Sequence, residues 1–196
     1  MRTTMLMLTL AAVGALCLAG CSTAPKSTTA RADLNSEVQT AVRVARDTDA
    51  GLQKFFDTAA GYAVFPEVGK GAVGVGGAFG RGELFQAGQM VGYCSMTQAS
   101  VGLALGGQKY TEIIFFETPE AVNRFKSNNY TFAAQASAVA LKSGASANAK
   151  YADNVLVFTM SQAGLMVEAS IGGQKFSFEP TAQAAAQPAS YQASEQ

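Results

Sequence analysis

Hydrophobic and polar positions follow a helical pattern in the first part of the chain that could form a core. Between residues 34 and 60, apolar side chains such as Val38 and Val42 recur at helical spacing, and the charged positions between them carry both signs. Mixed charges favour packing on a core, because a helix at a membrane interface typically has a Lys/Arg-rich face. Ser36 followed by Gln39 is a capping-box pattern, so we predict that one helix, or two collinear ones, begins there.

From Gly61 onward the pattern becomes that of a sheet. Short runs rich in Val, Phe, Tyr and Ile are separated by glycine, as is typical of an antiparallel meander, sandwich or barrel. Thr118 and Pro119 signal one helix between these runs, and residues 132–141 fit either a helix or a buried strand. The runs NVLVFTMS, GLMVEASI and QKFSFEP predict C-terminal strands. We therefore predict an α+β fold, with an N-terminal helical segment packed on a bent, glycine-rich antiparallel sheet or partial barrel.

The glycine-rich stretch GKGAVGVGGAFGRGELF, residues 69–85, begins with a match to G-x-G-x-x-G. A dinucleotide site needs a helix after this motif, and the glycines that follow Gly74 prevent one. A P-loop needs Ser or Thr after its lysine, and Lys70 is followed by Gly71. Glycine inside a strand marks a sharp bend or the close approach of another backbone. We therefore predict strongly bent strands against which a helix or another strand packs closely.

The N-terminus has the features of a secretory signal. A charge at Arg2 is followed by an apolar run that is shorter than the roughly 20 residues of a membrane span. The sequence LAGC, which ends at Cys21, resembles the bacterial lipobox. The resemblance implies cleavage before Cys21 and attachment of diacylglycerol and an acyl chain such as palmitate. An ordinary signal peptide with an incidental cysteine is the alternative. By analogy with sorting rules, Ser22 indicates the outer membrane.

Composition divides the chain into four parts. We predict a lipoprotein signal peptide in residues 1–20, a flexible tether in 21–33, one domain in 34–180 and a disordered tail in 181–196. The domain is long enough to bury a core of its own.

Charge and residue types argue against several functions. The chain has 14 basic and 14 acidic residues, so nothing attracts nucleic acid globally. It has no histidine, which excludes a Ser-His-Asp triad and a histidine-ligated zinc site. Cys94 has no basic neighbour, so we predict a buried structural cysteine. We expect a protein that is not an enzyme and has no cofactor or metal. The carboxylates that could form acid–base pairs are expected to be solvated; they are Glu112 with Glu117 and Glu67 with Glu83.

Three sequence blocks carry a family resemblance. GYAVFPEVGKGAVGVGGAFGRGELF, GLALGGQKYTEIIFFETPEAVNRFKS and FTMSQAGLMVEASIGGQKF are similar, in order and spacing, to the signature blocks of the SYLF (Ysc84-like) domain. The resemblance covers roughly residues 37–180. It implies the binding of membranes that contain phosphoinositides and the regulation of actin in eukaryotic members. Bacterial members are commonly secreted proteins or lipoproteins.

Four cations lie within two positions of a glycine, where exposed backbone N–H groups can also reach an anion. They are Lys70, Arg81, Lys109 and Lys175. We hypothesise that some of them converge on an anionic or phosphoinositide-like lipid headgroup, with solvated surface cations as the alternative. The predicted function is that of an outer-membrane lipoprotein, anchored by its lipid, that binds anionic lipid or another envelope component. A structural protein that docks a protein partner through its sheet face is the competing class.

Overall fold

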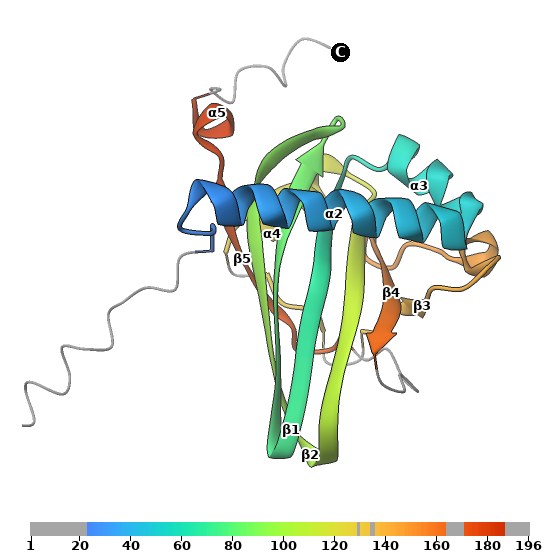
Figure 1. The fold of residues 1–196 in the computed structure, drawn as a ribbon. Helices are drawn as coiled ribbons and strands as arrows, with labels where there is room; N and C mark the ends of the chain where they lie inside the picture. Colours follow the sequence, from blue (N-terminus) through green and yellow to red (C-terminus); the bar gives the residue numbers. More distant parts are fainter. Residues whose placement is uncertain (1–22, 129, 134–135, 164–170, 187–196) are drawn as a thin grey trace, which may run out of the picture.

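The computed structural model describes residues 23–128, 130–133, 136–163 and 171–186. Within these ranges, the side chains of residues 72–75, 100–106 and 163 are not described. Figure 1 shows a long helix lying across a sheet of long, bent strands. The elements are α2 (Thr28–Thr48), the 3-10 helix η2 (Ala50–Leu52), α3 (Gln53–Thr58), β1 (Gly61–Gln86), β2 (Gln89–Phe116), α4 (Pro119–Lys126), β3 (Val139–Ala140), the 3-10 helix η3 (Ala145–Asn148), β4 (Val155–Ala163), β5 (Lys175–Pro180) and α5 (Ala182–Ala185).

A single β-hairpin, folded over on itself, forms most of the sheet. β1 and β2 pair antiparallel along their whole length and are joined by a two-residue turn at Ala87 and Gly88, whose φ angles are 48° and 74°. The register shifts between Val73 and Val75, and there the hairpin turns back, at the end far from α2 (Figure 1). It therefore has two limbs. The first limb is 61–72 with 107–116, and the second is 76–86 with 89–99.

Each limb is extended by a strand from the C-terminal part of the chain. β4 pairs antiparallel with β2 in the first limb, and β5 pairs antiparallel with β2 in the second. β3 adds a short parallel pair to the edge of β4, which makes the five-stranded sheet mixed. The predicted α+β class and bent, glycine-rich sheet are confirmed. Among the described strands, β3 is the parallel exception.

The two limbs approach each other backbone to backbone. A Cβ atom added at Gly82 would lie 2.2 Å from the carbonyl oxygen of Val64 and 2.9 Å from Cδ1 of Phe65. One added at Gly80 would lie 2.9 Å from Cγ2 of Val68 and 3.2 Å from the carbonyl oxygen of Glu67. No side chain larger than hydrogen fits at either position, which confirms the prediction of close approach.

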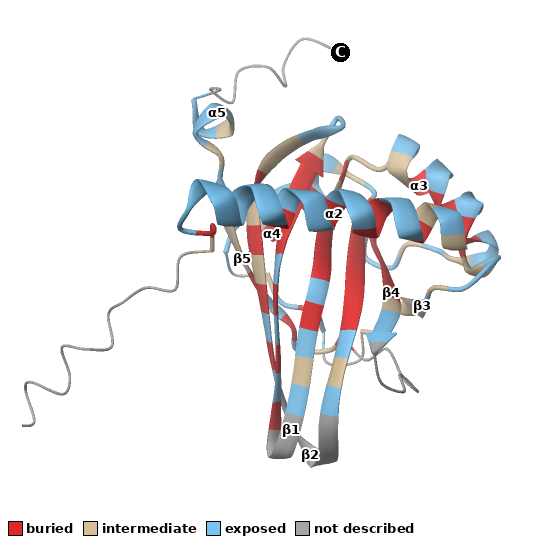
Figure 2. Cartoon of the chain, in the orientation of Figure 1, coloured by how far each residue is buried: buried red, intermediate tan, exposed pale blue. Residues whose placement is uncertain are grey.

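Strand alternation sends apolar side chains to two separate clusters. Figure 2 shows that buried residues are concentrated where β1 and β2 pass α2. Ala63 and Phe65 point into the inner cluster between the limbs, which α4 closes with Phe125. Val64 points outward to the cluster beneath α2 and α3. The buried face of α2 consists of Leu34, Val38, Ala41, Val42 and Ala45. Both faces of the first limb are therefore covered, which explains its continuous apolar run.

The N-terminal boundary differs from the prediction. α2 begins at Thr28 rather than after Ser36, because the hydroxyl oxygen of Ser27 accepts a hydrogen bond from the N–H of Ala30 at 3.1 Å. Residues 28–33 are thus helical, and a tether that extends to residue 33 is wrong. Before the helix, buried Ala24 donates its N–H to Oε2 of Glu179 at 3.0 Å. Cys21 and the predicted signal peptide lie outside the described residues.

Other sequence predictions have mixed outcomes. The glycine-separated runs between residues 61 and 116 form two long strands rather than several short ones, because only Gly88 lies in a turn and the other glycines lie within β1 and β2. The helix at Pro119 is confirmed, with the Thr118 hydroxyl as its N-cap. Of the three C-terminal strands, β4 and β5 are confirmed, and residues 164–170 lie outside the described residues. The predicted disordered tail is wrong for 182–185, which form α5. No helix in the described ranges is long and apolar enough to cross a membrane.

We expect Gly82→Ala to lower the free energy of unfolding by about 3 kcal/mol, because its methyl group would overlap the backbone of the opposite limb. Gly71→Ala is the matched control, since a Cβ atom there meets nothing within 4 Å. It should change the stability by no more than about 0.5 kcal/mol. Urea unfolding followed by circular dichroism measures both, and equal stabilities would contradict the backbone contact between the limbs.

Candidate functional site

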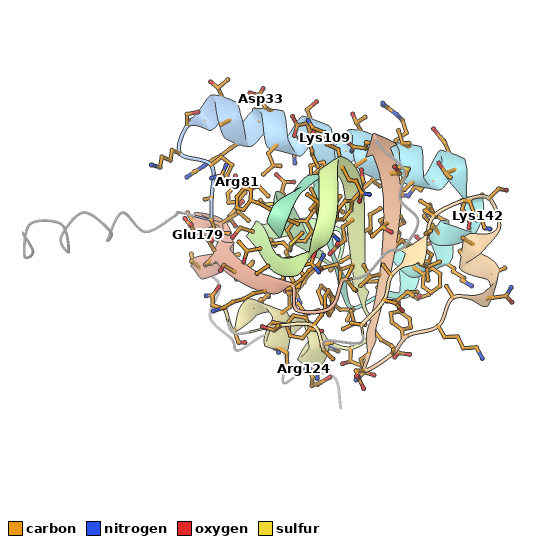
Figure 3. The ribbon with its side chains drawn as sticks, turned by 90° about the horizontal axis from the view of Figure 1, so that it is seen from below. Asp33, Arg81, Lys109, Arg124, Lys142 and Glu179 are labelled. Atoms are coloured by element: carbon orange, nitrogen blue, oxygen red, sulfur yellow. The ribbon has the colours of Figure 1, made fainter. Side chains whose placement is uncertain are left out.

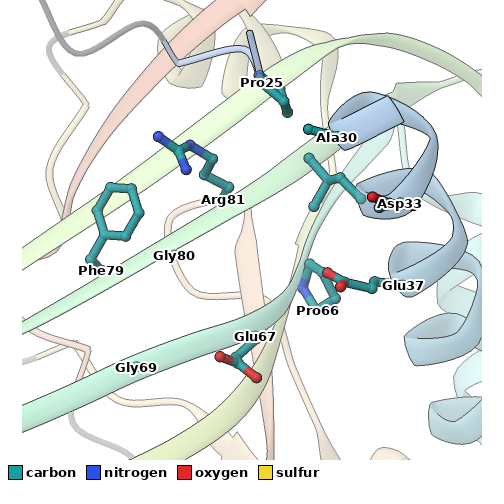
Figure 4. Close-up of a pocket in the computed structure, with 11 residues that line it drawn as sticks. Pro25, Ala30, Asp33, Glu37, Pro66, Glu67, Gly69, Phe79, Gly80 and Arg81 are labelled. Atoms are coloured by element: carbon teal, nitrogen blue, oxygen red, sulfur yellow. The ribbon is translucent and has the colours of Figure 1, made fainter. Parts of the chain in front are cut away.

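A groove of about 500 Å³ lies between α2 and the two limbs of β1 (Figure 4). One wall comes from the start of α2 and the residues just before it, and the rest comes from the first and second limbs. The lining residues are Pro25, Ala30, Asp33, Leu34, Glu37, Pro66, Glu67, Gly69, Phe79, Gly80 and Arg81.

Local irregularities of β1 shape this groove. Gly69 and Gly80 leave its floor without side chains. Pro66 lies at the register shift between Phe65 and Val68, where β1 bulges. The Pro66 carbonyl oxygen accepts a hydrogen bond from the Thr111 hydroxyl at 2.8 Å, which fixes the bulge from the neighbouring strand. Both limbs are hydrogen-bonded along the sheet, so the paired strands hold the residues that line the groove.

The groove separates its charges. Asp33 and Glu37 lie on the helix wall, whereas Arg81 lies on the second limb with its guanidinium directed away from them (Figure 4). One arginine against three carboxylates gives a formal charge of +1 − 3 = −2. Glu67 is partly neutralised by Lys109, whose Nζ lies 2.8 Å from Oε1. Arg31, whose Nε donates a hydrogen bond to the Pro25 carbonyl oxygen at 2.9 Å, places a further positive charge beside the lining. The groove is therefore marked by the separation of its charges rather than by a strong net charge.

Two of the four predicted cations share one face of the second limb. In one row across the strands, Phe79 of β1 pairs with Thr97 of β2, and Thr97 pairs with Lys175 of β5. In the next row on the same face, Arg81 pairs with Ser95, and Ser95 pairs with Ser177. Residues directly opposite each other point to the same side of a sheet. We call this surface the strand patch; it comprises Phe79, Arg81, Ser95, Thr97, Lys175 and Ser177. It holds two cations, and the adjoining row of the same face holds two carboxylates, Glu83 and Glu179, on either side of Tyr93. Glu83 accepts a hydrogen bond from Asn35, and Glu179 accepts one from the N–H of Ala24.

The other two cations are separated from this patch. Lys109 pairs with Gly69 on the first limb and binds Glu67 at the groove. Lys70 pairs with Gln108, the residue before Lys109. Because successive side chains of a strand point to opposite faces, Lys70 and Lys109 lie on opposite faces of the sheet. Figure 3 shows Arg81 and Lys109 on the α2 side of the molecule, away from Arg124. The structure thus places Arg81 of β1 and Lys175 of β5 on one face, with β2 between them, and places the other two cations elsewhere.

Phe79 gives the strand patch an apolar component. Its side chain is 46% exposed, an unusual state for a phenylalanine in a sheet. The Arg81 guanidinium lies 5.3 Å from the centre of its ring, within the range of a cation–π contact. An apolar ring beside two cations suits a surface that meets both headgroups and acyl chains.

Two carboxylates that we predicted to be solvated are buried, so that prediction is wrong for Glu83 and Glu112. The Glu83 carboxylate accepts a hydrogen bond from the Asn35 amide at 3.0 Å, and burial raises its pKa. The Glu112 carboxylate accepts a hydrogen bond from Gln174 Nε2 at 2.9 Å, and its other oxygen has no hydrogen-bond partner among the described residues. Burial raises the pKa of Glu112 to about 7. Their sequence partners, Glu67 and Glu117, are exposed, so neither pair forms. The alternation in YTEIIFF could have placed Glu112 inside.

Cys94 is fully buried, as predicted, and burial is the main cause that raises the pKa of its thiol. A thiol in this state is unreactive. In the ranges that the structure describes, no three His, Cys, Asp or Glu side chains are grouped as metal ligands.

Comparisons with known proteins point to one family. Residues 97–193 match the family profile described as "Ysc84: Las17-binding protein actin regulator". The chain is also 27% identical, over 152 residues, to beta cell expansion factor A of Aeromonas veronii. That alignment covers 75% of this chain and 56% of the relative, so the chain spans little more than half of that protein's length.

Glu112→Gln should stabilise the protein above neutral pH. The pKa of the Glu112 carboxyl rises from 4.5 to about 7 on folding, so the folded state holds the proton more tightly than the unfolded state. The free energy of unfolding therefore falls as the pH rises from about 4.5 to about 7. A neutral glutamine avoids this loss. We expect a gain of about 2 kcal/mol in unfolding free energy at pH 8 and little change at pH 4.5. Urea titrations at both values measure it, with exposed Glu117→Gln as the control. A gain of the same size at both pH values would show that Glu112 does not titrate in this way.

Proposed function

Because the chain belongs to the SYLF (Ysc84-like) family, we propose that it is a non-enzymatic module that binds phospholipid headgroups at an envelope membrane. Membership of the family supports a lipid- or protein-binding role in general. The observation that carries the lipid assignment is the strand patch, where Arg81 and Lys175 lie on one exposed face beside Phe79.

The strand patch offers the interactions that a phosphate needs. A guanidinium donates two parallel hydrogen bonds to phosphate oxygens, and an ammonium adds a point charge. The hydroxyls of Ser95 and Thr97 lie between the two cations on the same face. With 14 charges of each sign, the whole chain has no net attraction to an anionic bilayer, so a local site must supply it. Each cation close to an anionic membrane contributes about 1 kcal/mol.

The lipobox-like sequence supports anchorage at Cys21 in the outer membrane. Ala24 packs against the body of the domain, and it lies only three residues after the cysteine that would be acylated. Three residues span at most about 10 Å. A lipid on Cys21 would therefore hold the start of α2 close to the bilayer surface rather than on a long tether.

A protein partner is the second candidate. The exposed ring of Phe79 on the strand patch favours it, because aromatic side chains are enriched at protein interfaces. The two candidates differ in one respect. A headgroup site depends on anionic lipid and on salt, whereas a protein-docking site would leave vesicles unbound.

We expect the secreted Cys21→Ser protein, which carries no lipid, to co-sediment with vesicles in proportion to their anionic content, and less at high salt. Arg81→Glu with Lys175→Glu should reduce this binding at least tenfold by reversing both charges of the strand patch. The matched control is Lys142→Glu with Lys150→Glu, the same change at exposed lysines outside the patch. Equal losses in the two double variants would argue against a localised site, and no sedimentation of the Cys21→Ser protein would favour a protein partner.

The anchor has a separate test. A cell that produces the natural chain should incorporate labelled palmitate into it and retain it in the outer-membrane fraction, since acyl chains stabilise membrane attachment by about 0.8 kcal/mol per methylene. Cys21→Ser should remove the label and release the protein. Labelling that persists in the variant would place the lipid elsewhere.

A further inference from the structure

The geometry points to a more specific ligand: we propose that the groove binds the phosphoethanolamine headgroup of a zwitterionic phospholipid. In this arrangement Arg81 receives the phosphate, and Asp33 and Glu37 receive the primary ammonium group. The inference rests on the proposed lipid-binding function and names the ligand of the groove beside the strand patch.

The lining of the groove presents charges of both signs. Arg81 attracts a phosphate on one side, and Asp33 and Glu37 attract a positive group on the other. A phosphate beside Arg81 is therefore bound more tightly if a positive group of the same ligand faces the opposite wall. A phosphoethanolamine headgroup has this pattern, because its phosphate and ammonium groups are separated by a two-carbon linker.

The placement of the charges agrees with this pattern. Figure 4 shows Arg81 on one side of the groove and the carboxylates of Asp33 and Glu37 on the other, with Glu67 below. Asp33 and Glu37 are four residues apart on α2 and therefore share one helix face. Glu67 is already engaged by Lys109 at 2.8 Å. The two helix carboxylates are thus the acceptors left for an ammonium group.

The groove favours a primary ammonium over a quaternary one. A primary ammonium donates three hydrogen bonds, which suits carboxylate acceptors. A choline group has no N–H and is typically bound by a cage of aromatic rings. The lining includes a single aromatic residue, Phe79, whose ring is already in contact with Arg81 at 5.3 Å.

The position of the groove in the chain places it where a lipid would be found. Pro25 lines it, only four residues after the proposed acylation site at Cys21. Four residues span at most about 14 Å, so an anchored domain would hold this wall of the groove near the headgroups. Pro25, Leu34 and Phe79 supply an apolar lining that suits the adjoining glycerol and acyl carbons.

The test compares two zwitterionic lipids that have the same net charge. Vesicles of phosphoglycerol lipid are mixed with an equal fraction of either phosphoethanolamine or phosphocholine lipid, and binding of the full-length Cys21→Ser protein is measured by co-sedimentation. We expect about fivefold tighter binding to the phosphoethanolamine mixture. Soluble glycerophosphoethanolamine should compete, whereas glycerophosphocholine should not, which separates headgroup recognition from differences in bilayer packing.

A double variant locates the effect in the groove. Asp33→Asn with Glu37→Gln should abolish the fivefold preference while binding to pure phosphoglycerol vesicles is kept or strengthened, because two negative charges are removed. Both positions are exposed on α2, so the fold should not change, which circular dichroism verifies. Glu120→Gln, an exposed carboxylate on α4, is the matched control and should keep the preference.

The outcomes separate this inference from the function on which it rests. Equal binding to the two mixtures, or a preference that survives Asp33→Asn with Glu37→Gln, overturns the amine site and leaves the strand patch intact. Absence of binding to every vesicle overturns both. Loss of the preference only in the groove variant supports the inference.

Discussion

The contact between the two limbs of the folded hairpin is the constraint on which the rest of the structure depends. Gly80 and Gly82 allow the second limb to lie against the backbone of Val64 and Glu67. This contact closes the inner apolar cluster on one side. On the other side it brings Arg81 next to the bulge at Pro66, and so creates the groove. A methyl group at either glycine would separate both regions at once.

The sequence predicts the need for close approach but not the partner. Glycine-rich strands indicated a bend and a neighbouring backbone, and both were found. The same glycines also suggested separate strands, because glycine is equally typical of turns. Only Ala87 and Gly88 form the turn of the hairpin, and the point where it folds over lies at a register shift within both strands. Which glycines face another backbone is set by contacts between distant residues, which local patterns do not encode.

The candidate site could be predicted only in part for a related reason. Cations beside glycines led to Arg81 and Lys175, which do share a face. Lys70 and Lys109 belong to the same pattern, yet a difference of one position in register sends them to opposite faces. The carboxylates on α2 were missed because a helix start at Ser36 left Asp33 in a tether. The earlier N-cap at Ser27 adds two turns of helix, and those turns supply a wall of the groove.

The distribution of charge follows from the same architecture. Inside the sheet, Glu112 is held beside Gln174 with one oxygen unpaired, so the interior favours the uncharged acid. Outside, α2 and the two limbs hold charges of opposite sign apart on rigid elements, and rigid placement lowers the entropic cost of binding a ligand. Because the chain as a whole is neutral, this local separation of charge, rather than net charge, determines which ligands the protein can attract. The two glycines that bring the limbs together are therefore also what places Arg81 across the groove from the carboxylates of α2.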